Sequence, residues 1–522
     1  MKKSILSLSA AVALGGLGFA GSANAWVASS DDGAATGLFL HAAGVGHQLF
    51  TPYYTANAGM ATLVNIVNTD STNGKAVKVR FRSATNSDDV LDFTLFLSPA
   101  DVWTGAVLQG TDGRASLITN DKSCTIPVAS QWPTGGVPFI TTRLPSYATD
   151  DVKAALTREG YIEVLNMADI DPDSDLFTAT KHVNGVAPCL ADTPLTGSTS
   201  YSALRNNLLN TTSGDAGVSG ANADGLVNPT GGLMGTWAVL DLANMGTYSG
   251  TQTAVIATAD TSVGASGTVT TAAANLQFFP QHGLSGPTTL EAADWTADPL
   301  LTGGVITPLW FDFPDMSTPA IAGEIPNQQA YNLSNALAKT NVINEYIATA
   351  ADASVPFLTD WVVSQPTRRY HAAVSYGTVS SAAAIVLNTG SYANPYSSLL
   401  ALQQTDYGPQ ACLQMTFQST DREEYAVATS VDGGFSPGTP ASVLRYCGEV
   451  FVAKFGSTSS LQAVITAGQL TPAADAGWGT LGAASALPIV GYAATLFSNT
   501  STGNKYGMTF QHRWLSGGLT TP

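Results

Sequence analysis

Short β-prone runs separated by turn residues are the feature that most constrains how this chain folds. The run 62–67 is rich in β-branched residues, 68–74 has turn chemistry, and 75–82 alternates between apolar and basic side chains. The apolar members are Val77, Val79 and Phe81, and the basic members are Lys78, Arg80 and Arg82. This pattern predicts a β-hairpin that turns its apolar face to a core and its basic face to solvent.

Similar runs along the chain favour a mainly β protein. Residues 92–97 predict another strand, and 493–514 predict a second hairpin near the C-terminus. Many short strands with Gly, Asn, Asp and Pro between them are typical of β-sandwich-like antiparallel sheets, and one or two sandwiches fit the pattern. We expect a few short helices, over 150–159, 200–209 and 327–350.

Composition divides the chain into four parts. Residues 1–25 have the pattern of a secretory signal peptide: two lysines, an uncharged apolar run, and small residues before a cleavage site. The expected mature parts are a β-rich region at 26–280, an irregular Pro/Gly/Thr-rich connection at 281–326, and a helix followed by a β-rich region at 327–522. No later apolar stretch reaches the length of a membrane helix, so we expect no transmembrane span in the mature chain.

The cysteines fit an exported protein. They are Cys124, Cys189, Cys412 and Cys447, and none has the close spacing of a zinc or redox site. An even number in an exported chain favours two disulfides, for which three connectivities exist. We favour Cys124–Cys189 and Cys412–Cys447 because each closes the shorter loop. On the chain-entropy view each would stabilise the fold by about 4 kcal/mol.

The charge of the chain excludes two classes of partner. With 21 basic and 38 acidic residues, its formal net charge of −17 repels nucleic acid and anionic membranes. Charged residues form only 11% of the chain, against about 25% in ordinary globular proteins. The polar surface therefore comes largely from uncharged side chains such as Ser and Thr, which favours surface glycans or further copies of the chain as partners.

An acidic run is the candidate metal site. Its carboxylates stand at alternate positions: Asp169, Asp171, Asp173 and Asp175. Carboxylates at this spacing can converge on calcium, the one cofactor that the sequence indicates. The run lacks the glycine and the glutamate of an EF-hand loop. The alternative, which we favour, is a solvated acidic turn.

Two other features can bind an extracellular ligand. The first is the basic stripe, defined as Lys78, Arg80 and Arg82. Three acids follow it closely and can pair with it inside the protein: Asp88, Asp89 and Asp92. The second comprises the aromatic clusters 278–279 and 310–313, the latter containing Trp310, which can stack on sugars or fill a core. Internal pairing and core packing are the favoured alternatives.

No established catalytic motif is found in the sequence. The residues around Ser375 lack the first glycine of a nucleophile elbow and are better interpreted as a strand. The six histidines are scattered without HExxH spacing, and no pair of acids stands out for glycoside hydrolysis. We therefore favour a non-enzymatic protein, with a secreted hydrolase that has no recognisable motif as an alternative.

Several segments together resemble a family of uncharacterised exported proteins of Gram-negative bacteria, described as cell-surface proteins. The matching stretches are 52–54, 62–69, 75–82, 89–103, 160–164, 182–189, 229–233, 344–346 and 359–369. The resemblance implies an extracytoplasmic, β-rich protein and carries no established activity. The acidic run at 169–175 is not part of it.

Together these observations favour an exported structural protein of the cell surface, the outer envelope or the extracellular space, which assembles with itself. The main alternative is an extracellular module that binds a glycan or another ligand.

Overall fold

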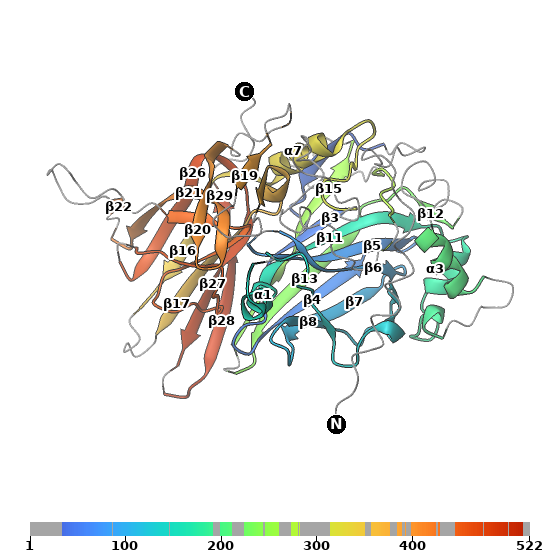
Figure 1. Cartoon of the computed structure of the whole chain (residues 1–522), viewed down its shortest axis with the longest axis horizontal. Helices are drawn as coiled ribbons and strands as arrows, with labels where there is room; N and C mark the ends of the chain where they lie inside the picture. Colours follow the sequence, from blue (N-terminus) through green and yellow to red (C-terminus); the bar gives the residue numbers. More distant parts are fainter. Residues whose placement is uncertain are drawn as a thin grey trace.

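In the computed structural model the chain forms antiparallel β-sheets with a few short helices, as predicted (Figure 1). The structure describes residues 34–85, 87–145, 147–191, 199–210, 224–243, 246–259, 273–279, 281, 314–349, 356–375, 384–388, 392, 398–423, 426–428, 444–472, 474–499 and 501–514. The predicted signal peptide at 1–25 and Trp310 lie outside these residues.

The first β-sandwich consists of two sheets. Sheet 1 has the order β1 (Gly37–Leu40), β15 (Thr253–Thr258), β3 (Gln48–Thr55), β11 (Glu159–Ile170), β5 (Gly74–Ser83), β6 (Asp89–Leu97) and β9 (Cys124–Ile126), with β12 (Leu226–Val227) on β11. Sheet 2 has the order β10 (Val137–Pro138), β8 (Ala115–Ile118), β7 (Val102–Gln109), β4 (Met60–Asn68), β13 (Leu233–Asp241) and β14 (Gly246–Thr251), with β2 (Val45–Gly46) on β13.

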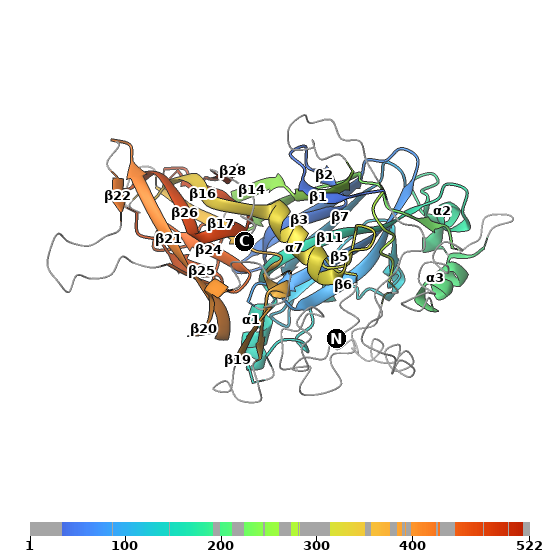
Figure 2. The same cartoon turned by 90° about the horizontal axis from the view of Figure 1, so that it is seen from above.

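The second β-sandwich lies beside the first (Figures 1 and 2). Sheet 3 has the order β20 (Leu400–Thr405), β21 (Gly408–Asp421), β26 (Ala476–Pro488), β16 (Ala338–Ile347) and β29 (Arg513–Trp514), with β22 (Ala426–Ala428) and β23 (Leu444–Cys447) on β21. Sheet 4 has the order β25 (Ala467–Gln469), β24 (Val450–Lys454), β17 (Phe357–Ser364), β27 (Val490–Ser498) and β28 (Lys505–Gln511). A separate pair joins β18 (Ala372–Ser375) to β19 (Ala384–Leu387), so the residues before and including Ser375 form a strand.

The described helices are short: α1 (Asp150–Leu156), α2 (Asp175–Thr180), α3 (Tyr201–Asn210) and α7 (Pro326–Leu337). The helices predicted over 150–159 and 200–209 are confirmed as α1 and α3. The helix predicted over 327–350 is correct in its first half and wrong in its second half. That helix ends at Leu337, and Ala338 begins strand β16, because β-branched residues such as Val342 and Ile343 favour a strand that pairs with β26. Among the described residues, no helix is both long and apolar enough to cross a membrane.

The two predicted hairpins have different outcomes. The C-terminal one is confirmed up to Gln511, since β27 and β28 pair antiparallel, whereas Arg513 and Trp514 pair with β16 in sheet 3. The N-terminal one is wrong: β4 pairs with β7 and β13 in sheet 2, whereas β5 pairs with β6 and β11 in sheet 1. The turn between them connects the two layers of the sandwich, and it therefore joins strands that face each other rather than strands that share hydrogen bonds.

The central strands of sheet 1, β3, β5 and β11, are buried on both faces. The apolar residues of β5 pack in the core that faces sheet 2: Val77, Val79 and Phe81. The opposite face is covered by later segments, and Phe278 and Met316 belong to the core cluster on that side. Phe278 and Phe279 are both buried, which confirms the core-packing alternative for this aromatic cluster.

Two disulfides connect the cysteines as predicted. Cys124 is bonded to Cys189, and Cys412 is bonded to Cys447, its direct partner across β21 and β23. Disulfides of this kind fit an oxidising, exported environment.

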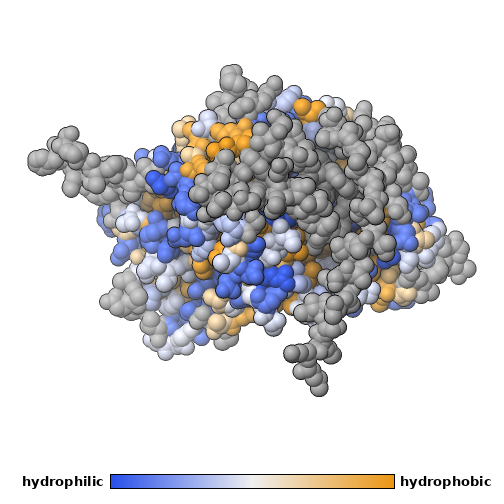
Figure 3. All heavy atoms as spheres, in the orientation of Figure 1, coloured by the Kyte–Doolittle hydropathy of each residue, from blue (hydrophilic) through white to orange (hydrophobic). Residues whose placement is uncertain are grey.

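On the face seen in Figure 3, hydrophilic and hydrophobic residues are interspersed.

Candidate ligand-binding groove

The basic stripe lies inside the protein, so the prediction that it faces solvent is wrong. Its three side chains are buried and form ion pairs: Lys78 with Asp92 at 2.8 Å, Arg80 with Asp89 at 3.3 Å, and Arg82 with Glu163 at 2.8 Å. Arg80 also donates to the carbonyl of Pro314, from the segment that covers this face of sheet 1. The stripe thus offers no accessible cationic surface to a ligand, and the internal pairing with nearby acids matches the favoured alternative.

The acidic run does not gather around one point. Asp169 is buried in β11 and pairs with Lys75, and Asp171 accepts a hydrogen bond from the backbone N–H of Asp173. Asp175 begins α2 and accepts from Thr199. Within the described ranges, no group of three or more His, Cys, Asp or Glu side chains is arranged to hold a metal ion. The convergence expected of a calcium site is therefore not seen at these carboxylates.

A large groove lies where the two sandwiches meet. One wall comes from β1 and the start of β15, and the other from β16, β26, β29 and the ends of β21 and β28. Its volume is about 1640 Å³, which exceeds the roughly 300–1,000 Å³ of small-molecule pockets. The groove is thus large enough for an extended ligand.

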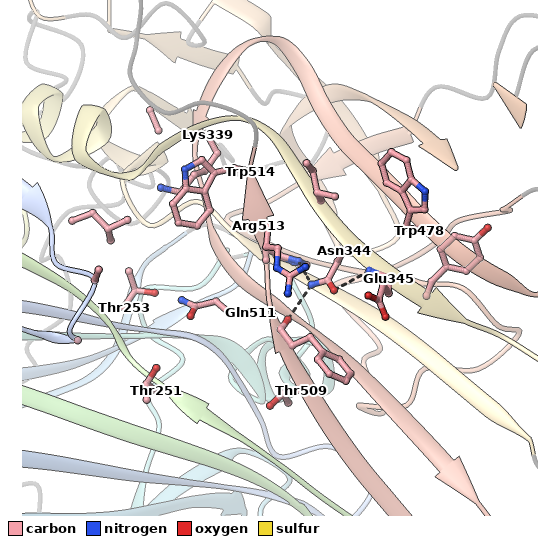
Figure 4. A pocket seen from close by; sticks show the side chains of 18 of the residues that line it. Thr251, Thr253, Lys339, Asn344, Glu345, Trp478, Thr509, Gln511, Arg513 and Trp514 are labelled. Carbon is pink, nitrogen blue, oxygen red and sulfur yellow. Dashed lines mark hydrogen bonds between the residues drawn. The ribbon is translucent and has the colours of Figure 1, made fainter. Parts of the chain in front are cut away.

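The register of sheet 3 places polar and aromatic side chains together in this groove. Glu345 on β16 lies opposite Trp478 on β26, and Ile343 lies opposite Arg513 on β29. Because directly opposed residues project from the same face, Glu345, Trp478 and Arg513 share one face of the sheet. Figure 4 shows Arg513, Asn344 and Glu345 between Trp478 and Trp514.

Glycine on both sides of Trp478 permits the close packing of β26 against β21. A Cβ atom at Gly477 would lie 2.0 Å from the carbonyl oxygen of Thr420, and one at Gly479 would lie 2.7 Å from the ring of Phe417. Only glycine fits at such close approaches. Trp478 therefore projects from a strand whose position its two neighbours fix, and 45% of its surface is exposed.

His512 fixes the chain where it crosses from sheet 4 to sheet 3. Its Nε2 lies 2.9 Å from the carbonyl of Val362, which can only accept, so Nε2 carries the proton. The Nδ2 group of Asn344 donates to Nδ1 of His512 at 3.0 Å and to the carbonyl of Phe510 at 3.0 Å. Burial lowers the pKa of His512 to about 4, so the ring is neutral at ordinary pH. These bonds hold Arg513 and Trp514 in place.

Trp514 forms the other aromatic side of the groove. The ammonium group of Lys339 lies 4.0 Å from the centre of the indole ring, a cation–π contact that orients the ring. Burial lowers the pKa of Lys339 to about 8. The Trp514 side chain remains 41% exposed. Two exposed indole rings thus stand at this groove with amide, carboxylate, guanidinium and hydroxyl groups between and below them (Figure 4).

The two walls are held together by buried contacts between the sandwiches. Tyr161 and Trp237 of the first sandwich share a core cluster with Val362 and Tyr492 of the second. Tyr248 donates to the carbonyl of Ser460 at 3.0 Å, and the N–H of Glu449 donates to the carbonyl of Ala84 at 2.7 Å. The two sandwiches that carry the groove walls are therefore packed against each other through a shared core.

Sequence reasoning missed the groove residues because they come from strands far apart in the chain. Trp478 is opposite Glu345, which lies more than a hundred residues earlier. The signals available were local: the Gly-Trp-Gly run at 477–479 and the His-Arg-Trp run at 512–514. The acids and hydroxyls around them carry no motif spacing. Comparison with protein-family profiles, with curated proteins and with solved structures gave no match.

Proposed function

We propose that this chain is an exported surface or envelope protein whose groove between the sandwiches binds an uncharged polysaccharide. The observation that carries the proposal is the pair of exposed indole rings, Trp478 and Trp514, at an open groove with polar groups between them. Indole rings offer flat apolar faces that stack on the C–H faces of sugar rings, and they combine an apolar body with a polar edge.

The polar groups of the groove match the hydroxyl groups of a neutral sugar. Glu345 and the threonine hydroxyls can accept, whereas Arg513 and the amide of Gln511 can donate. Lys339, Arg422 and Arg513 are balanced in part by Glu345 and Asp421, so the groove carries no strong excess of one charge. An acidic chain with a mixed groove favours neutral over anionic polysaccharides.

Affinity electrophoresis tests this proposal. The purified mature protein is run in native gels that contain a neutral β-glucan, a galactomannan or anionic alginate. We expect retardation in at least one neutral gel and its loss on combined Trp478→Ala and Trp514→Ala substitution. Unchanged mobility in every gel, or retardation that survives the double substitution, would contradict the proposal.

Self-assembly is a second candidate, favoured by one specific observation. The edge strand β28 exposes three apolar side chains on one face: Tyr506, Met508 and Phe510. Tyr506 stacks on Phe497, which stacks on Phe357 in the next strand, so the row extends across the sheet. The backbone edge of β28 lies against β14, where Thr509 donates to the carbonyl of Ser249. The exposed apolar face, rather than the edge, can therefore pack against a second copy of the chain.

Sedimentation velocity separates the two proposals. If assembly uses β28, the wild-type protein sediments as oligomers at micromolar concentration, and combined Tyr506→Ser and Met508→Ser substitution yields monomers that keep polysaccharide binding. A wild-type protein that stays monomeric at all concentrations rules out assembly and leaves the groove proposal untouched.

A further inference from the structure

The bulge in strand β11 brings three reactive side chains together in the interior of the first sandwich. Lys75 on β5 lies directly opposite Asp169 on β11, and the register shifts between Asn166 and Ala168. The extra residue at Met167 reverses the alternation, so Asn166 and Asp169 project from the same side of the strand. Both side chains therefore meet the end of Lys75.

Hydrogen bonds define the geometry of this cluster. The Nζ atom of Lys75 lies 2.7 Å from Oδ1 of Asp169, and Nδ2 of Asn166 lies 3.2 Å from the same oxygen. The amine and the amide are thus within two hydrogen-bond lengths of each other, bridged by one carboxylate. Lys75, Asn166 and Asp169 are 0%, 1% and 1% exposed, so bulk water does not reach them.

Thr230 holds the cluster in place. Its backbone N–H donates to Oδ2 of Asp169 at 3.1 Å, and its carbonyl accepts from Nδ2 of Asn166 at 2.9 Å. Lys75 also contacts the hydroxyl of Thr230 at 3.2 Å and Asp70 at 3.5 Å. Among the described residues, Oδ1 of Asn166 accepts no hydrogen bond although it is buried. No donor therefore fixes the amide oxygen, and the orientation of the amide group is set by the two bonds of its Nδ2.

We propose that Lys75 and Asn166 form an intramolecular amide bond that links β5 to β11 covalently, with Asp169 as the proton carrier. This site is independent of the groove and of the proposed function. In the first step Asp169 takes a proton from the Lys75 ammonium and leaves a free amine, which is the nucleophilic form. Transfer within a buried ion pair gives two neutral groups, which a water-excluded interior favours over separated charges.

In the second step Nζ attacks Cγ of Asn166. The Nζ–Cγ bond forms and the Cγ–Nδ2 bond breaks after Asp169 passes its proton to Nδ2, which departs as ammonia. The second proton lost from Nζ returns to Asp169 and leaves with the ammonia as ammonium, so the carboxylate is restored. The step needs no oxidant, metal or further reactant. Burial raises the pKa of Asp169, which fits a carboxyl group that holds a proton during the transfer.

A neighbouring cluster with similar groups is a natural comparison. Lys78 pairs with Asp92 at 2.8 Å and donates to the amide oxygen of Gln281 at 2.6 Å. The nearby charges of Lys78 and Arg80 lower the pKa of Asp92 although burial opposes this, so Asp92 stays a carboxylate and cannot carry a proton to an amide. We expect no covalent bond there, and Lys78→Arg is therefore a matched control.

Intact mass spectrometry tests the proposal. The mature protein is reduced and alkylated, its N-terminus is determined by sequencing, and its mass is compared with the mass calculated for the unlinked chain. We expect a mass lower by one ammonia, and a tryptic product in which the peptide 159–181 stays joined to the peptide that ends at Lys78, with no cleavage after Lys75. The Lys78→Arg variant retains the same deficit.

The substitutions Lys75→Arg, Asn166→Ala and Asp169→Asn each remove one required group and should restore the unlinked mass. If these variants do not fold, the wild-type mass and peptide map still decide the question. A wild-type protein with the full unlinked mass overturns the proposal. A deficit of one water with a bond at Asp169, or a link between Lys78 and Gln281, overturns it as well.

Discussion

The carboxylate of Glu159 accepts a hydrogen bond from the backbone N–H of Thr466 at 3.1 Å and so connects the two sandwiches. The backbone N–H groups of Val464 and Ile465 donate to the same carboxylate at 2.7 and 3.1 Å. Glu159 lies at the start of β11, and the other three residues precede β25. One buried acid thus caps a turn of the other sandwich.

Substitution of Glu159 should therefore weaken the interface. In Glu159→Gln the amide keeps one acceptor oxygen but turns an NH2 group towards backbone donors. Because hydrogen bonds to a charged group contribute about 1.5–3 kcal/mol, we expect the free energy of unfolding to fall by about 2–4 kcal/mol. Urea unfolding followed by tryptophan fluorescence measures this.

A matched variant separates the charge from the side-chain contact. Thr466→Val removes the hydroxyl group that also contacts Glu159 and leaves the backbone bonds, so it should cost only about 1 kcal/mol. Equal stability of wild type and Glu159→Gln would show that this clamp does not hold the sandwiches together.

His512 should make stability depend on pH. Its pKa is about 4 in the folded protein and 6.5 as an ordinary histidine. Between these values the unfolded chain binds a proton that the folded chain does not, so unfolding is favoured as the pH falls from 6.5 to 4. Protonation also turns Nδ1 into a donor, which conflicts with the donor group of Asn344.

The variant His512→Gln tests this sign. It should lower stability at neutral pH, yet its free energy of unfolding should change less steeply between pH 4 and 6.5. The difference in slope approaches about 1.4 kcal/mol per pH unit, the value for one proton. Parallel stability curves for wild type and variant would mean that His512 already titrates in the folded protein as it does in the unfolded chain.

The bond between Cys412 and Cys447 should contribute measurably to stability. It closes a loop with a sequence separation of 35 residues. On the chain-entropy view, the double substitution Cys412→Ser and Cys447→Ser should lower the free energy of unfolding by about 4 kcal/mol. Denaturant unfolding under non-reducing conditions gives the value by comparison with the oxidised wild type, which keeps both disulfides. A loss below about 1 kcal/mol would show that pairing of β21 with β23 keeps this segment ordered without the bond.

Local patterns in the sequence predicted much of the fold. The alternation at 75–82 is a strand, and the cysteine pairs with the shorter loops are the bonded ones. The sequence did not reveal that Asn68 to Gly74 connects two layers, because a turn has the same residues whether the flanking strands pair or face each other. It also did not reveal that 314–321 covers the basic stripe, because a charged face is expected to meet water unless a distant segment supplies partners such as Asp315.

The groove was beyond sequence reasoning for a related reason. Its residues are joined by the register of β16, β26 and β29, which depends on pairing between distant segments. Trp478 and Trp514 belong to no common motif, and the residues next to each of them in the sequence do not indicate a binding site. Only the folded sheet places Glu345 and Arg513 beside them.

The most direct test of the central claim is the affinity of the groove for a polysaccharide. Isothermal titration with the neutral polysaccharide that retards the protein in gels compares wild type, Trp478→Ala, Trp514→Ala and the control Leu242→Ala, which alters an exposed apolar residue outside the groove. We predict that each tryptophan variant binds about tenfold more weakly, a loss of about 1.4 kcal/mol, and that the control binds as wild type does. Equal affinity in all four proteins would contradict the account.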